Sequence, residues 1–208
     1  MMVDLPLLLA FLAAASILTI TPGVDTAMVL RTATVDGRRP AALSALGIAL
    51  GCLLWGGAVS LGLGALLRAS ELAYTVVKLM GAGYLIWIGT KLLLKPRRTL
   101  DAAPEQARPG GQDAFWRGLL TNLLNPKVGV FYVTFLPQFV PSGASVAVYT
   151  FFLACLHVVL SLAWFALLIA ATVSLGRVLR HPRVVQRLDR LTGVVFIGFG
   201  LKLSASKA

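Results

Sequence analysis

One stretch decides the class of this protein: LPLLLAFLAAASILTITPGVDTAMVL, residues Leu5–Leu30. Apart from Asp25 it carries no charge, and it exceeds the about 20 apolar residues with which an α-helix crosses a hydrocarbon core about 30 Å thick. The strands of a membrane barrel would alternate apolar and polar residues, and this stretch does not. It therefore predicts a membrane-spanning helix.

Five further apolar blocks follow, at Ala41–Leu67, Leu72–Leu94, Phe115–Val140, Ala144–Val173 and Val184–Leu203. The chain is 58% hydrophobic and only 13% charged, whereas soluble domains have about 25% charged residues. We therefore expect an all-α integral membrane protein of about six transmembrane helices, the last being the shortest. Its single domain, residues 1–208, would contain two halves, about 1–94 and 115–208, joined by a proline- and glycine-rich linker at about 95–114.

Most of the 19 Lys and Arg residues lie in alternate connections. They gather between the first and second blocks, between the third and fourth, and before the sixth, whereas the connection Phe139–Val146 has none. By the positive-inside rule these basic connections are cytoplasmic and both termini face outward. The net charge of +11 is therefore an orientation signal. We expect no nucleic-acid binding, which would need the charges on one folded face with aromatic residues between them.

The two halves share a pattern. Phe11 precedes Thr21-Pro22-Gly23 as Phe115 precedes Asn125-Pro126-Lys127, with the proline 11 residues after the phenylalanine in both. Each half holds three helices, an odd number, so the second would enter the membrane from the opposite side. Such inverted repeats are typical of secondary transporters. Chance similarity between apolar segments is the alternative.

Pro22 and Pro126 lie well inside their apolar blocks. Within a helix a proline removes a hydrogen bond and clashes with the preceding turn, but it is favourable directly after an N-cap such as Thr21 or Asn125. We therefore expect discontinuous first and fourth helices. Each would have a half-helix N-terminus inside the membrane, where unpaired N–H groups and a partial positive charge attract a carboxylate. An ordinary proline kink is the alternative.

Two opposite charges, Asp25 and Lys127, accompany the breaks. Since a charged residue at the bilayer centre costs about 2.5–3.5 kcal/mol, we expect the two to meet between the halves. Our hypothesis is that Asp25 takes up and releases a proton while Lys127 and the helix ends, with Gly23, hold an anionic group of a solute. A permanent salt bridge is the alternative. Asn122 either lines the pathway or bridges helices, and His157 is either a packing residue or a proton relay.

Four segments resemble the lysine-exporter/homoserine–threonine-resistance superfamily of bacterial amino-acid exporters. They are TPGVDT (Thr21–Thr26), KLMGAGYLIWIG (Lys78–Gly89), FWRGLLTNLLNPKVGVFYVTFLPQFV (Phe115–Val140) and LDRLTGVVFIGFGLKL (Leu188–Leu203). The resemblance implies a six-helix carrier of the bacterial plasma membrane that exports an amino acid or related metabolite, with protons as the exchange partner. It identifies neither the amino acid nor the oligomeric state. Members often have PGPD where this chain has Val24, so the first break is expected to bend less here.

A membrane-embedded enzyme and a channel are the alternatives to a carrier. The sequence has no HExxH motif, GxxxxGK[ST] phosphate loop, CxxC pair or carboxylate dyad. We therefore expect no catalytic residue, no metal and no cofactor. A channel would need a polar filter built as a ring, which two unequal broken helices do not provide.

Overall fold

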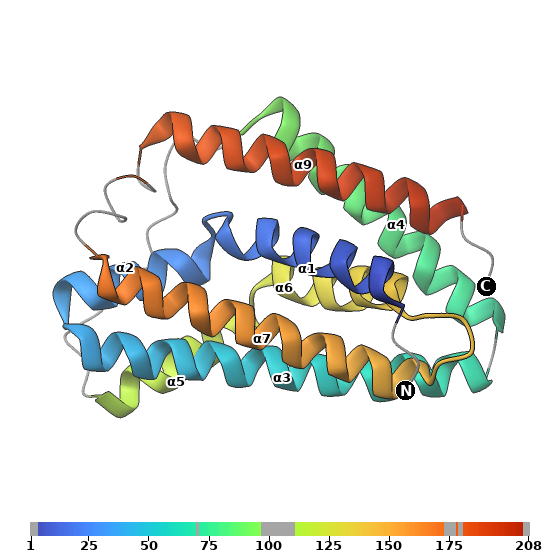
Figure 1. Cartoon of the computed structure of the whole chain (residues 1–208), viewed down its shortest axis with the longest axis horizontal. Helices are drawn as coiled ribbons and strands as arrows, with labels where there is room; N and C mark the ends of the chain where they lie inside the picture. Colours follow the sequence, from blue (N-terminus) through green and yellow to red (C-terminus); the bar gives the residue numbers. More distant parts are fainter. Residues whose placement is uncertain (1–3, 70, 97–110, 173–177, 179–180, 206–208) are drawn as a thin grey trace.

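The computed structural model describes residues 4–69, 71–96, 111–172, 178 and 181–205, which form helices and no strand. Long helices run side by side along the molecule (Figure 1). The beginning of the first helix and the end of the last lie at the same end of the molecule (Figure 1). Most of the expected linker, residues 97–110, lies outside the described residues.

The first half begins with a broken helix. α1 (Leu5–Ile20) and α2 (Val24–Val35) are separated by Thr21–Gly23 and bent by 52°. α3 (Arg38–Ala69) and α4 (Glu71–Leu94) follow. The bounds of α3 and α4 agree with the expected blocks to within a few residues. The first block was expected to end at Leu30, whereas α2 continues to Val35.

The second half has the same order of elements. α5 (Gly111–Leu123) ends before a break, after which α6 (Pro126–Val130) continues into the π-helix η1 (Phe131–Phe135) and the 3₁₀-helix η2 (Leu136–Phe139). The bend between α5 and the segment Lys127–Phe139 is 58°. α7 (Val146–Ala170) and α9 (Pro182–Ala205) complete the fold. The prediction that the first and fourth helices are discontinuous is confirmed.

Part of the fold meets the length and apolarity requirements of a membrane span. Arg38–Gly62 of α3 and Val146–Ala170, which is α7, are long and apolar enough to cross a membrane, and each bent pair passes as one span, which makes up to four within the described residues. The apolar part of α4, Leu79–Leu94, is shorter. The first half of α9 carries four charged residues, Arg183, Arg187, Asp189 and Arg190, which are too many for an uninterrupted apolar span. Six crossings and the inverted repeat therefore stay predictions.

The first break differs in detail from the expectation. Thr21 is not the N-cap of the following helix but the C-cap of α1: its hydroxyl and its N–H both donate to the Ile17 carbonyl, at 2.7 and 3.0 Å. α2 begins only after Pro22, with Gly23 as N-cap and no side-chain cap bond. The Thr21 hydroxyl is already used on α1 and on Thr192 of α9, with which it shares a hydrogen bond, so it does not turn to cap α2.

Backbone-to-backbone packing at glycines fixes two helix pairs. α3 packs along α5, and α4 packs along α9. A Cβ on Gly89 of α4 would lie 2.7 Å from the Gly193 carbonyl oxygen, and one on Gly193 would lie 2.6 Å from that of Gly89. Such an approach is open only to residues without a side chain, and small residues serve this purpose between membrane helices.

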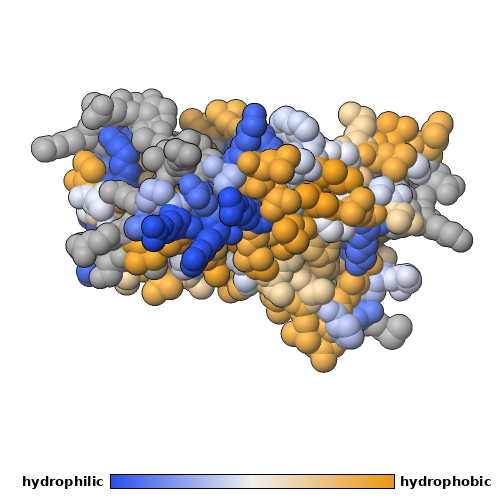
Figure 2. All heavy atoms as spheres, turned by 90° about the horizontal axis from the view of Figure 1, so that it is seen from above, coloured by the Kyte–Doolittle hydropathy of each residue, from blue (hydrophilic) through white to orange (hydrophobic). Residues whose placement is uncertain are grey.

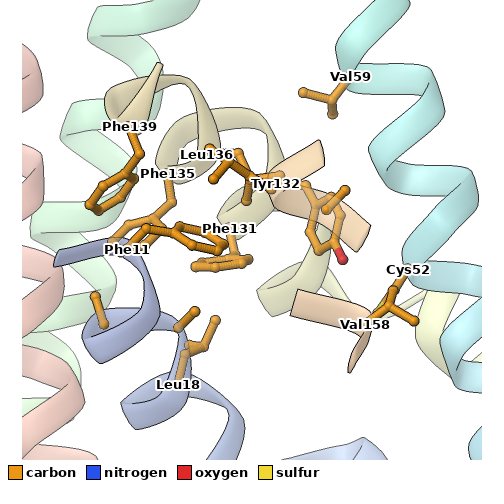
Figure 3. Packing of buried hydrophobic residues seen from close by; sticks show 14 of the residues in the cluster. Phe11, Leu18, Cys52, Val59, Phe131, Tyr132, Phe135, Leu136, Phe139 and Val158 are labelled. Carbon is orange, nitrogen blue, oxygen red and sulfur yellow. The ribbon is translucent and has the colours of Figure 1, made fainter. Parts of the chain in front are cut away.

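Two apolar clusters fill the interior at different heights. One joins Val29, Leu30, Ala45, Ile48, Phe165 and Leu168, from α2, the start of α3 and the end of α7. The other is largely aromatic and gathers Phe11 of α1 against Phe131, Phe135 and Phe139 of η1 and η2 (Figure 3). The broken ends of α1–α2 and α5–α6 lie between these clusters.

Candidate functional site

The carboxylate of Asp25 joins the two broken helices. Asp25 lies in the first turn of α2. Its Oδ2 accepts a hydrogen bond from Asn122 Nδ2 of α5 at 2.8 Å, and its Oδ1 accepts one from Asn125 Nδ2 at 3.3 Å. Asn122 and Asn125 come from the second break, so residues about 100 positions apart in sequence meet here. Each carboxylate oxygen thus has one neutral amide donor, which offsets part of the cost of burying it.

The ammonium of Lys127 lies on the other side of the first break. Its Nζ donates to the Thr21 carbonyl at 3.5 Å, and a Cβ on Gly23 would lie 3.7 Å from it. Lys127 also interacts electrostatically with Asp25. Opposite charges from the two halves of the chain therefore face the same break, as the sequence predicts, with amides holding the carboxylate directly.

The second break is capped from within. Asn125 is the N-cap of α6, and its Oδ1 accepts the Lys127 N–H at 3.1 Å. This cap is the one predicted from the sequence. Because α6 has only five residues and one of its first N–H groups is already bonded, the Lys127 side chain is a stronger candidate than the helix end for holding an anion.

A second set of polar contacts leads away from Asp25. Asn122 Nδ2 also lies 3.4 Å from Cys52 Sγ of α3, and Cys52 is hydrogen-bonded to Tyr132 of η1. The Tyr132 hydroxyl in turn lies 2.9 Å from His157 Nδ1 of α7. Tyr132 turns its hydroxyl away from the neighbouring phenylalanines and towards Cys52 (Figure 3). Side chains from α2, α5, α3, η1 and α7 are thereby linked.

These groups surround a small cavity of about 60 Å³. Asp25, Lys127, Asn125, Thr21 and Gly23 line it, together with one face of α7 formed by His157, Ser161 and Phe165. One water needs about 10–15 Å³, so the cavity has room for about four to six atoms of water size. It is polar on the side of the breaks and bounded by residues of both apolar clusters.

The structure brings the eight predicted site residues into one region, but not all of them line the cavity. Five of the eight line it and Asn122 holds Asp25, whereas Pro22 lies in the first break and Pro126 is the first residue of α6. Sequence reasoning did not propose Cys52, Tyr132, Ser161 or Thr192. The spacing of His157, Ser161 and Phe165, four residues apart, is the signal that could have indicated a cavity-lining face of α7. In the described ranges, no three His, Cys, Asp or Glu side chains form a group able to hold a metal ion.

Comparisons with known proteins agree over nearly the whole chain. The sequence model of the family described as LysE type translocator matches residues 16–207. The chain is 30% identical over 207 residues to the uncharacterized membrane protein YrhP of Bacillus subtilis, covering 96% of this chain and 99% of that one. It is 30% identical over 191 residues to the threonine efflux protein of Escherichia coli K12 (90% and 92%), and 28% identical over 198 residues to the leucine efflux protein of Klebsiella pneumoniae (94% and 93%). No solved structure matches the chain.

Proposed function

Since this chain belongs to the LysE type translocator family, we propose that it exports an amino acid or a related small metabolite across the bacterial plasma membrane in exchange for protons. The threonine and leucine efflux proteins that align with nearly its full length support the amino-acid part of this proposal. One transport domain made of both halves follows, because each half contributes one of the two breaks.

The observation that carries the proposal is the placement of Asp25 and Lys127 on one cavity. An amino acid is a zwitterion, so a site for it needs an anion for the ammonium group and a cation for the carboxylate. Asp25 and Lys127 both line the cavity and come from opposite halves of the chain. We assign the solute ammonium to Asp25 and the solute carboxylate to Lys127, where charge-assisted hydrogen bonds form.

Proton exchange follows from competition at Asp25. A proton and a solute ammonium are both cations that need the same carboxylate oxygens. A carrier that cannot hold both at once must release one to take the other, which is the requirement for exchange. Asn122 and Asn125 hold the carboxylate through neutral amides, so no positive charge occupies either oxygen permanently through these contacts.

The cavity is too small for an amino acid, so the structure corresponds to a closed state of the proposed carrier. Its volume of about 60 Å³ holds only about four to six water-sized atoms, whereas threonine has eight non-hydrogen atoms. The aromatic cluster of Phe11, Phe131, Phe135 and Phe139 (Figure 3) lies on the side nearer the loop that precedes α7. Solute entry therefore requires α1–α2 and α6–η1 to separate, as broken helices do in alternating access.

We propose that the basic end of the molecule faces the cytoplasm and both termini face outward. Arg183, Arg187 and Arg190 of α9 are exposed. Hydrophilic side chains gather over one end of the face that carries α9, and hydrophobic ones cover much of the remainder (Figure 2). This distribution supports the orientation expected from the positive-inside rule.

Exchange in proteoliposomes tests the proposal. Vesicles loaded with one unlabelled amino acid at a time are diluted into the same labelled amino acid, with and without a pH gradient. We expect saturable counterflow for at least one amino acid, and faster movement when the side opposite the labelled solute is acidic. One proton per neutral solute at 100 mV supplies about 2.3 kcal/mol, enough for a gradient of roughly 45-fold. If no amino acid moves, or if flux does not saturate, the proposal fails.

A further inference from the structure

A second, larger cavity lies beside the second broken helix, on the far side of the α6–η1 segment from the polar cavity. It has a volume of about 460 Å³, within the range of about 300–1,000 Å³ found for small-molecule sites. Its walls are formed by Trp55 of α3, Met80 and Tyr84 of α4, Leu124 directly after α5, and Val133 of η1. The lining is almost entirely apolar, and the cavity is a groove between α3 and α4 that the α6–η1 segment closes at the back.

The groove opens to the outside of the helix bundle. At its rim, Leu124 is 79% exposed and Met80 is 71% exposed. Tyr84 lies near the middle of α4 and Trp55 near the middle of α3. In a chain that spans a membrane, this depth is that of the acyl chains and not of the headgroups.

From these observations we propose that the groove binds a phospholipid acyl chain. At mid-depth of a bilayer the molecules next to an exposed apolar rim are acyl chains, and an apolar lining offers no site for a headgroup or a charged solute. The volume is sufficient for a section of a chain, whereas a flat outer surface would not enclose one.

The groove and the polar cavity lie on opposite faces of one segment. Lys127 and Val128 line the polar cavity, Gly129 and Val133 line the groove, and Asn125 lines both. α6 also contacts the groove wall closely, since a Cβ on Gly129 would lie 2.9 Å from the Trp55 ring. An acyl chain in the groove therefore presses on the back of the segment that carries Lys127. This consequence for transport rests on the proposed function, whereas the binding itself does not.

Trp55 provides a direct probe of the occupant. A variant with Trp87, Trp116 and Trp164 replaced by phenylalanine keeps Trp55 as its one fluorophore of this type. It is reconstituted in phosphatidylcholine vesicles whose acyl chains carry bromine near the middle or near the headgroup, and in unbrominated vesicles. We expect strong quenching of Trp55 by mid-chain bromine and weaker quenching by bromine near the headgroup.

Filling the groove gives the decisive comparison. Val133→Phe in the same background adds bulk to the groove, and we expect it to remove most of the mid-chain quenching. Val194→Phe, at an exposed position of α9, is the matched control and should leave quenching unchanged. Leu123→Phe, on another wall of the groove, serves if Val133→Phe does not give a monodisperse helical protein.

Two results would overturn the proposal. Quenching that is equal in the filled and unfilled variants would show that bromine reaches Trp55 by another route. Quenching that falls as the protein-to-lipid ratio rises would show that a second copy of the chain occupies the groove instead. Neither readout needs a transported solute, so failure of the exchange assay does not affect this test. If exchange is observed, its rate should change in Val133→Phe and not in Val194→Phe.

Discussion

Tyr132 and His157 form a buried pair in which the tyrosine hydroxyl lies 2.9 Å from His157 Nδ1. Tyr132 is 0% and His157 6% exposed. The pair joins the π-helix η1 to α7, and His157 also lines the polar cavity. The hydrogen bond fits the packing role expected for His157, and the alternative of a proton relay stays a prediction.

Removal of the tyrosine hydroxyl should show how much the Tyr132–His157 hydrogen bond contributes to the stability of the fold. Tyr132→Phe leaves His157 Nδ1 buried without that partner, which costs about 1–3 kcal/mol, so the apparent melting temperature of the purified protein should fall. His157→Gln retains a side chain that can bond the hydroxyl and should lose less than His157→Leu. A double-mutant cycle of Tyr132→Phe and His157→Leu should give a coupling of about 0.5–3 kcal/mol. A coupling of zero would mean that the contact does not stabilise the fold.

Asp25→Asn should separate binding from proton coupling. The substitution keeps the shape of the side chain and an acceptor for the Asn122 or Asn125 amide, but it removes the charge that a proton and an ammonium group would share. We expect solute affinity in counterflow to fall about ten- to hundredfold, the value of one charged hydrogen bond of about 1.5–3 kcal/mol. Any residual exchange should no longer respond to a pH gradient.

A suitable control for that variant is Asp4→Asn. Asp4 is an exposed N-cap of α1, and asparagine caps helices about as well as aspartate, so exchange should stay normal. If Asp25→Asn proteoliposomes still respond to the pH gradient as the wild type does, Asp25 is not the proton-binding group.

Lys127→Met should weaken binding of the solute carboxylate. The side chain keeps much of its length but loses the ammonium that contacts the Thr21 carbonyl at 3.5 Å. We expect the KM for the amino acid to rise about tenfold or more, because a charged hydrogen bond contributes about 1.5–3 kcal/mol. An amino-acid amide, which lacks the carboxylate, should compete equally poorly with both proteins.

Lys91→Met is the matched control for this change. Lys91 is exposed on α4, with its Nζ 5.4 Å from the centre of the Trp87 ring, and it lies outside the cavity lining. Kinetics close to those of the wild type are expected. Equal effects of the two lysine substitutions would indicate a general effect of charge and contradict the assignment of Lys127.

The sequence was informative where a residue is costly in a membrane. Proline inside an apolar block and a charge at mid-membrane are both unfavourable without a structural reason, and Pro22, Pro126, Asp25 and Lys127 therefore located the two breaks. The polarity pattern did not reveal Tyr132, because the π-helix η1 departs from the 3.6-residue period on which such patterns rest. Contacts between distant segments, such as Thr21 with Thr192, depend on how the helices pack, which the local sequence does not specify.

The pairing of the helices could not be predicted from the sequence either, because glycine spacing permits close packing but does not specify which helix packs against which. The pairing of α4 with α9 can be tested by substitution. Gly89→Ala places a methyl group against the backbone of Gly193 in α9. Such overpacking costs about 1–3 kcal/mol, so the melting temperature should fall. On the same helix, Gly83 is exposed and a Cβ there has no neighbour within 4 Å among the described residues. Gly83→Ala should instead be neutral or stabilising by up to about 1 kcal/mol, since alanine is the better helix former. Equal melting temperatures for the two variants would show that α4 and α9 are not packed at Gly89.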